Sequence, residues 1–303
     1  MILATPLIEN LKNRFPQAQI DFLVRKGNEG LLEDHPKLTS LLIWDKKKKY
    51  QSLFSLLLRI RKNRYDLVVC VQRFFNAGLL TALSKAKTKV GFDKSPFSFT
   101  FNHSIIHQIG NGKHETERNL ELIEEWVKKG DRKPKLYPLP KHFTQVEPLQ
   151  KTPYICMAPA SVWFTKQYPK EKWVELVQQH PQEQIYLLGS AGDEALCNEI
   201  ITLSKHSKIQ SLSGKLNLLE SAALMEKAKM NYVNDSAPMH LASSMNAPTT
   251  AFFCSTIPEF GFYPLSDNST IKEIKEELPC RPCGLHGKSE CPLGHFKCGY
   301  SIC

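Results

Sequence analysis

The sequence lacks any uninterrupted apolar run of about 18 residues, which is the length that a membrane-spanning helix needs. It also lacks the basic segment and short apolar core with which a secretory signal peptide begins. These absences argue against integral membrane and exported proteins, so we expect a soluble, cytoplasmic protein. The sequence contains no recognisable single-strand-binding platform or groove-reading module. A basic, non-catalytic nucleic-acid-binding protein is therefore kept only as an alternative, and no nucleic acid partner is expected.

The composition is that of a globular protein with a strongly basic balance. The chain has 303 residues, of which 42% are hydrophobic and 23% charged, and this length suits two domains of about 150 residues. The formal net charge of +10 favours polyanionic partners, which include nucleotide diphosphates, nucleic acid and anionic membrane surfaces. Four consecutive lysines at 46–49 are either a solvated loop or a contact with anionic headgroups or substrate.

Cysteine is unevenly distributed along the chain. Of nine cysteines, five lie within the last two dozen residues: Cys280, Cys283, Cys291, Cys298 and Cys303. Zinc in proteins takes four nitrogen or sulfur ligands, and His286 and His295 lie among these thiols. A structural zinc held by Cys280, Cys283, Cys291 and Cys298 is one interpretation. The spacing is not that of a standard finger, so an unmetallated tail packed on the last domain is the other.

The hydrophobic pattern predicts strands that alternate with helices in two separate series. In the first half we expect strands at 20–24, 41–44, 67–71 and 87–91 and helices at 2–14, 51–62, 78–85 and 115–128. In the second half we expect strands at 154–157, 184–188, 209–212, 230–233 and 249–253. Such alternation is typical of parallel sheets covered on both faces. A proline-rich linker at 133–153 then separates domains at 1–145 and 151–303.

The stretch from Asn234 to Leu241 predicts a strand-to-helix turn with a polar cluster. Asp235 and Ser236 are good N-cap residues and Pro238 suits a first helical turn. Free backbone N–H groups and the helix dipole make such a turn an anion site, which His240 could also reach. Ordinary helix capping, with a packed or solvated histidine, is the simpler interpretation of the same residues.

Several short motifs, taken in order, resemble glycosyltransferase family 9, the ADP-heptose:lipopolysaccharide heptosyltransferases. They are Thr5-Pro6-Leu7, His114 to Leu120, Ala158 to Ser161, Thr165 to Pro169 ahead of Trp173, Gly189, Ser213 to Lys215, Asn234 to Ala242 and Cys291 to His295. Each motif is weak alone, but together they extend over nearly the whole chain in a consistent order.

The resemblance implies an α/β fold with two Rossmann-like, doubly wound parallel-sheet domains that face a cleft, the GT-B type. It implies inverting transfer of a heptose from ADP-heptose to a lipid-linked core oligosaccharide of lipopolysaccharide. The protein would then be cytoplasmic and peripheral to the inner leaflet of the inner membrane, with no cofactor required. Transfer from another nucleotide sugar is the alternative within the same class.

The resemblance also assigns roles to individual residues of the donor half. Lys166 would contact the phosphates of the sugar nucleotide, and Asp235 and Ser236 would form the turn at the donor sugar and diphosphate. His240 would lie near the donor phosphates. Ala237 replaces a residue that is usually glycine in the family. Asp193 or Glu194 would hold the adenosine ribose.

The catalytic base is the one role that the resemblance leaves unassigned. Family members carry a strand and a Gly-Asp turn before the helix with the Thr-Pro-Leu pattern, and that aspartate is regarded as the base. In this sequence Met1 already falls in that helix, so the strand and base are absent. We expect an open apolar slot in the first sheet and weak catalysis. His114 or Glu115 would be the substitute candidates for the base.

Overall fold

The structure, a computed structural model, describes residues 1–302 and divides into two units. The first unit is Met1–Tyr137 and the second begins at Pro138. Cys303 lies outside the described residues. Among residues 1–302, no helix is long and apolar enough to cross a membrane.

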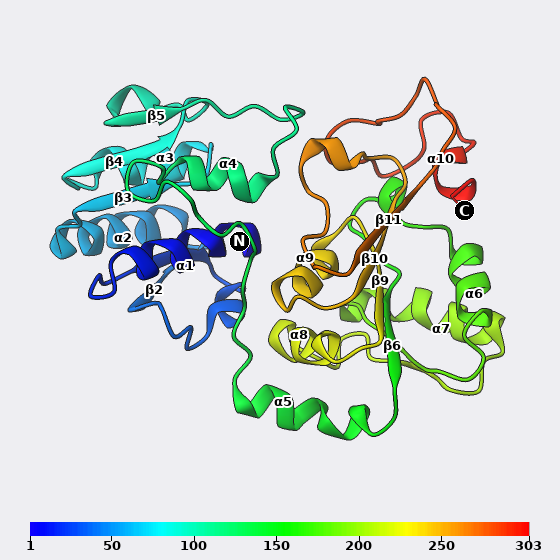
Figure 1. The fold of residues 1–303 in the computed structure, drawn as a ribbon. Helices are drawn as coiled ribbons and strands as arrows, with labels where there is room; N and C mark the ends of the chain where they lie inside the picture. The colour runs from blue at the N-terminus through cyan, green and yellow to red at the C-terminus, as the bar shows by residue number, and fades with distance from the viewer. Residues whose placement is uncertain (303) are drawn as a thin grey trace. The chain divides into compact units, whose positions relative to one another are not determined.

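The second unit contains a six-stranded, fully parallel sheet (Figure 1). Its strands are β6 Tyr154–Ala158, β7 Gln184–Leu187, β8 Ile209–Ser211, β9 Met230–Asn234, β10 Thr249–Phe253 and β11 Ser269–Glu273. Their order across the sheet is β11-β10-β9-β6-β7-β8. This is the doubly wound order of a Rossmann fold, in which the direction of winding reverses between the first and fourth strands of the unit, β6 and β9.

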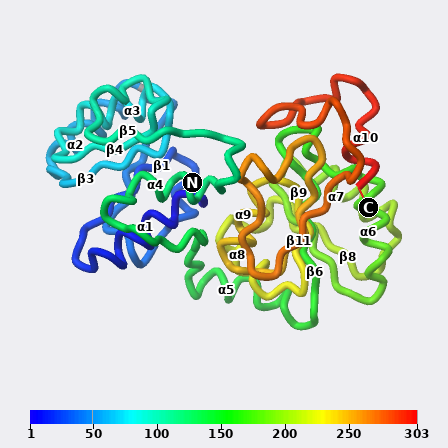
Figure 2. The backbone as a smooth tube through the Cα atoms, turned by 45° about the horizontal axis from the view of Figure 1, so that its top comes forward, coloured from blue at the N-terminus to red at the C-terminus, as the bar shows by residue number. Residues whose placement is uncertain are grey.

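Helices cover both faces of this sheet. They are α5 Pro140–Val146, α6 Lys170–Gln178, α7 Glu194–Ser204, α8 Leu218–Glu226, α9 Ala237–Ser244 and α10 Lys297–Tyr300. Figure 1 shows α6 and α7 on one face and α8 and α9 on the other. The tube in Figure 2 shows the same four helices around the strands. The core on one face centres on Trp173 and Phe252, whose rings meet edge to face.

The first unit contains two smaller parallel sheets. One sheet pairs β1 Asp21–Arg25 with β2 Ser40–Trp44, and the other has the order β3 Leu67–Cys70, β4 Thr88–Phe92, β5 His103–Ile105. Its α-helices are α1 Thr5–Arg14, α2 Lys49–Asn63, α3 Phe75–Leu83 and α4 Glu115–Glu121. Because α2 carries Leu56 and Ile60 one turn apart, it buries both against β2 and α3.

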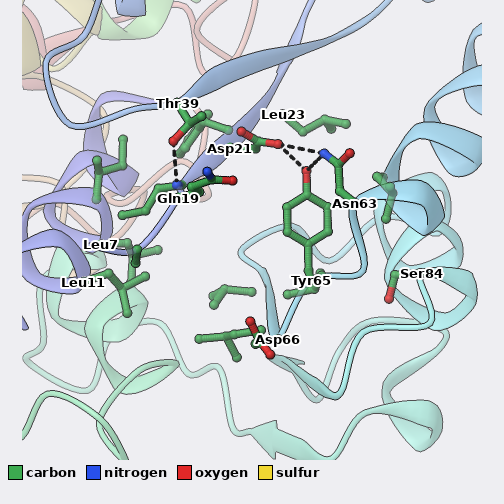
Figure 3. Close-up of a pocket in the computed structure, with 18 of the residues that line it drawn as sticks. Leu7, Leu11, Gln19, Asp21, Leu23, Thr39, Asn63, Tyr65, Asp66 and Ser84 are labelled. Carbon is green, nitrogen blue, oxygen red and sulfur yellow. Dashed lines mark hydrogen bonds between the residues drawn. The ribbon is translucent and has the colours of Figure 1, made fainter. Parts of the chain in front are cut away.

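A cavity of about 1300 Å³ lies between these two sheets (Figure 3). Within residues 1–302, β1 pairs only with β2 and β3 only with β4, and the residues of β1 and β3 both line the cavity. Apolar side chains from the surrounding helices, among them Leu7, Leu11 and Leu80, complete its wall. At one end Asp21 accepts hydrogen bonds from Tyr65 and, at 3.1 Å, from Asn63. The first unit therefore has the open apolar slot that the sequence predicts.

Several elements differ from the sequence predictions. The helix predicted at 115–128 ends at Glu121, and Leu122 and Ile123 continue it as tight turns with i to i−3 hydrogen bonds. Leu122 and Ile123 remain buried in these turns, so the apolar residues of this segment still recur at helical spacing. Strands β5 and β11 were not predicted, and α5 lies inside the predicted linker. Both strands are edge strands with exposed residues, so they lack the apolar pattern of the inner strands.

Candidate functional site

The candidate site lies where the winding of the second unit reverses. Lys166 belongs to the loop after β6, and Asp235 directly follows β9, the neighbouring strand. The Lys166 Nζ is 2.6 Å from the Asp235 carboxylate, and the two side chains are only 15% and 7% exposed. Thr256, which follows β10, donates a 2.7 Å hydrogen bond to the same carboxylate. Three strand ends thus converge at the position where open α/β sheets bind ligands.

The loop that carries Lys166 is fixed at both ends. Asn234, the last residue of β9, donates from its amide to Pro159 O at 2.8 Å and accepts from the Tyr168 backbone N–H at 2.9 Å. The Tyr168 ring stacks on Phe252 of β10 with the ring centroids 4.2 Å apart. Because these contacts are buried, the loop between Pro159 and Tyr168 is tied to the inner strands of the sheet.

A segment near the C-terminus packs against the Lys166 loop. Thr165 Oγ1 accepts a 2.8 Å hydrogen bond from the Lys288 backbone N–H and a 2.9 Å bond from Ser255 Oγ. Gly287 has φ +79°, and a Cβ atom there would lie 2.8 Å from Lys166 Cγ. A side chain at Gly287 would therefore displace the aliphatic stem of Lys166.

Arg281 supports the strand end that carries Thr256. It donates to Cys254 O at 2.8 Å and to Thr256 O at 2.7 Å, and it pairs with Glu273 of β11 at 2.6 Å. The sequence reasoning missed both Arg281 and Thr256. Thr256 could have been found, because it lies just beyond the end of the predicted strand at 249–253 and parallel strands present their carboxyl ends at one edge.

The N-terminus of α9 forms the other side of the site. Ser236 is the N-cap, no side chain caps it, and Pro238 lies in the first turn, as predicted. Ala237 is exposed, and His240 is half-buried one turn further on. Burial, together with the positive charge of Lys166, lowers the pKa of His240 well below its usual value. The histidine is therefore neutral at pH 7, so it can donate a hydrogen bond but adds no charge.

Asp193 and Glu194 follow β7, two strands from Asp235 in the sheet order. The Asp193 carboxylate accepts from Ser190 N at 2.7 Å and from Ser190 Oγ at 2.8 Å, so it caps the short helix after β7. The Glu194 side chain is exposed. A Cβ on Gly189 would lie 2.9 Å from the Asp193 Cβ, so the backbone approaches this carboxylate closely.

Asp235 is buried although it lies in a loop. The structure buries its carboxylate under Lys166 and Thr256. Its position immediately after the inner strand β9 explains this burial. The Lys166 ammonium, not the Asp235 carboxylate, is the more accessible charge of the pair.

The substitute candidates for the base have structural partners. His114 is fully buried as the N-cap of α4, and its Nδ1 accepts from the Thr116 backbone N–H at 3.2 Å. Glu115 is held by Arg118 at 2.8 Å and by His107 at 3.3 Å. Both residues thus stabilise the first turn of α4.

The cysteine-rich segment has two interpretations from its sequence, a zinc site and a tail packed on the second unit. Within residues 1–302, no three His, Cys, Asp or Glu side chains are grouped so that they could hold a metal ion. Cys280 approaches His295 at 3.9 Å, and Cys298 is buried in the core of the second unit. Burial and the neighbouring thiols raise the pKa of Cys298 to about 11 and also raise that of Cys283. Cys291 packs, partly buried, against the same core as Cys298.

A Rossmann-type sheet with a cationic side chain and a helix N-terminus at its switch point is the arrangement with which many α/β proteins bind nucleotides. The sequence model of glycosyltransferase family 9 (heptosyltransferase) matches residues 53–293. The chain therefore belongs to this family and is a glycosyltransferase, as its sequence motifs predict.

Curated relatives and solved structures agree with this assignment. The chain is 25% identical over 281 residues to lipopolysaccharide heptosyltransferase 3 of Escherichia coli K12, covering 84% of this chain and 79% of the relative. It is 24% identical over 303 residues to lipooligosaccharide heptosyltransferase 2 of Campylobacter jejuni, covering 98% and 89%. The fold matches E. coli ADP-heptose lps heptosyltransferase II with a TM-score of 0.77, 21% identity and coverage of 93% and 92%. It also matches E. coli heptosyltransferase WaaC with ADP, with a TM-score of 0.73, 18% identity and coverage of 89% and 88%. The predicted α/β fold with parallel sheets is confirmed.

Proposed function

We propose that this glycosyltransferase moves a heptose from ADP-heptose to a core sugar of lipopolysaccharide. The observation that carries the proposal is the Lys166–Asp235 pair at the switch point of the second unit. Its relatives include heptosyltransferases named for lipopolysaccharide or lipooligosaccharide. Similar folds have been solved with ADP and with ADP-2-deoxy-2-fluoro heptose.

Lys166 is proposed to stabilise the departing ADP. In the reaction an acceptor hydroxyl oxygen bonds to the anomeric carbon, while the bond from that carbon to the diphosphate oxygen breaks. The electron pair leaves on ADP, and the hydroxyl proton goes to a base that these residues do not identify. Attack from the face opposite the leaving diphosphate inverts the anomeric configuration. Lys166 and the backbone N–H groups at Ser236 and Ala237 would take up the charge on the diphosphate.

Asp235 acts as a positioning residue in this proposal. Its carboxylate accepts from Thr256 and pairs with Lys166, so it holds the ammonium at the carboxyl edge of the sheet. The neutral His240 would donate a hydrogen bond to the donor phosphates. Asp193 or Glu194, at the end of β7, would bind the adenosine ribose.

The acceptor side is proposed to operate at the cytoplasmic surface of the inner membrane. The lipid-linked acceptor would be held there in the inner leaflet. The basic residues of the first unit support this, because positive charge attracts a surface of anionic lipid. The protein would bind this surface peripherally.

A thermal-shift panel of nucleotide sugars tests the donor. A ligand that binds the folded state raises the unfolding midpoint in proportion to the logarithm of its concentration over its dissociation constant. We expect ADP and ADP-heptose to raise the midpoint more than UDP- or GDP-sugars at the same concentration. A larger shift with another nucleotide sugar would assign the enzyme to that donor instead.

A further inference from the structure

One face of α2 exposes large apolar side chains to solvent. Tyr50, Phe54 and Leu58 are 78%, 64% and 52% exposed. They follow one another at intervals of four residues, so they form a ridge along one side of the helix. The opposite side of α2 carries Leu56 and Ile60, which are buried in the first unit. Figure 1 shows α2 beside α3.

The charges around this ridge have one sign. Residues 46–64 contain eight lysines and arginines and no acidic residue. Lys46, Lys47 and Lys48 are exposed directly before α2, and Arg59 and Lys62 are exposed within it. These cations therefore border the apolar ridge at both ends.

The two acidic residues that flank this segment already have partners. The Asp45 carboxylate is 3.0 Å from Lys26 Nζ, and the Asp66 carboxylate is 2.6 Å from Lys87 Nζ. Neither carboxylate cancels the positive charge of the lysines at 46–48 or of the basic residues on α2. The segment as a whole therefore presents a positive field beside an apolar surface.

We propose that the α2 ridge docks on a bilayer that contains anionic lipid, with the helix lying in the plane of the interface. A helix with aromatic and leucine side chains on one side and flanking lysines has the features of an interfacial membrane helix. The phosphates of anionic headgroups match the lysines, and the acyl boundary accepts Phe54 and Leu58. A protein partner could offer acidic side chains to the lysines, but unlike a bilayer it would not offer a continuous apolar phase to the ridge. The inference rests on the proposed function, because it names the surface that would bring the enzyme to a lipid-linked acceptor.

Vesicle co-sedimentation tests the proposal directly. The full chain should sediment with vesicles of phosphatidylglycerol and phosphatidylcholine, and much less with phosphatidylcholine alone. Added salt should reduce the binding, because it screens the lysines. Leu58→Ser and Phe54→Ser should each weaken binding about tenfold, since each removes a side chain buried in the acyl boundary. Replacement of Lys46, Lys47 and Lys48 by Gln should abolish the preference for anionic vesicles.

Leu203→Ser is the matched control for Leu58→Ser. Leu203 lies on α7 in the second unit and is 50% exposed, so it is as exposed as Leu58 but has no run of lysines beside it. We expect its vesicle binding to equal that of the parent. ADP binding should be unchanged in every one of these variants, so a failure of the docking surface is distinguishable from a failure of the donor site. Equal sedimentation of the Leu58 and Leu203 variants would overturn the proposal, as would a concentration-dependent dimer that Phe54→Ser disrupts in the absence of lipid.

Discussion

Replacement of Asp235 by Asn tests how the site is held together. The change removes a carboxylate that is 2.6 Å from Lys166 Nζ and nearly buried, while the amide can still accept the hydrogen bond from Thr256. Breaking a buried ion pair by removing one partner costs about 3 to 5 kcal/mol. Because Lys166 keeps 15% of its side-chain exposure, we expect the lower end, about 3 kcal/mol of unfolding free energy. Urea unfolding followed by fluorescence measures this loss.

An exposed ion pair on α6 and α7 gives the control for this experiment. Lys170 and Glu199 are 2.7 Å apart, but their side chains are 35% and 56% exposed. Such surface pairs contribute about 0 to 1 kcal/mol, so Glu199→Gln should change the unfolding free energy little. Replacing Lys166 by Met in the Asp235→Asn background should restore part of the lost stability, because no buried charge then remains. If Asp235→Asn costs no more than Glu199→Gln, the buried pair does not organise the site.

Three further predictions follow from other parts of the structure. Gly287→Ala and Gly284→Ala should each lower the unfolding free energy by about 1 to 2 kcal/mol, because both glycines have positive φ. Only Gly287→Ala should also weaken ADP binding, since only its Cβ would displace Lys166. Calorimetric titration of both variants with ADP measures the difference. His107 is buried, and desolvation is the main cause that lowers its pKa. Below about pH 6.5 the histidine of the unfolded chain takes up a proton while that of the native state stays neutral. The unfolding free energy should therefore be unaffected by His107 above about pH 6.5 and fall by up to about 1.4 kcal/mol per pH unit below it. His107→Gln should therefore flatten the acid limb of a stability profile, whereas an unchanged limb would show that other groups cause it. A variant that carries an apolar strand and a Gly-Asp turn ahead of Ile2 should unfold at a higher urea concentration than the parent and have a higher transferase rate. A strand in the slot would pair with β1 and β3, and each new hydrogen bond would contribute about 1 kcal/mol. Equal stability and activity of the two would show that the slot does not take a strand.

The regular part of the fold was predictable from local pattern. The inner strands β6, β7, β9 and β10 are short, apolar and bounded by polar residues, so their positions follow from composition. The site could be located because Asp235 and Ser236 come between a buried strand and a helix. The pairing of β6 with β9 brings Lys166 beside Asp235. This pairing could not be predicted from local pattern, because strand order depends on contacts between residues far apart in the chain.

The partners of the site residues could not be predicted in this way. The site joins segments that are distant in sequence. Asp235 is buried and accepts a hydrogen bond from Thr256, and Gly287 packs on Lys166. The cysteine pattern left a zinc site and a packed tail both open for the same reason. A spacing shows which thiols are near in sequence, whereas the structure buries Cys298 in the core and leaves Cys280 half-buried.

Calorimetric titration with ADP-heptose, using the parent chain and Lys166→Met, is the most direct test of the proposed donor site. Loss of a charge-assisted contact with the diphosphate costs about 1.5 to 3 kcal/mol, which is roughly 10- to 150-fold in affinity. Lys170→Met serves as the control, because this lysine pairs with Glu199 on the surface. We predict that Lys166→Met weakens ADP-heptose binding by at least about tenfold while Lys170→Met leaves it unchanged. Equal affinity of the parent and Lys166→Met would contradict the placement of the donor diphosphate at the end of β6 and β9.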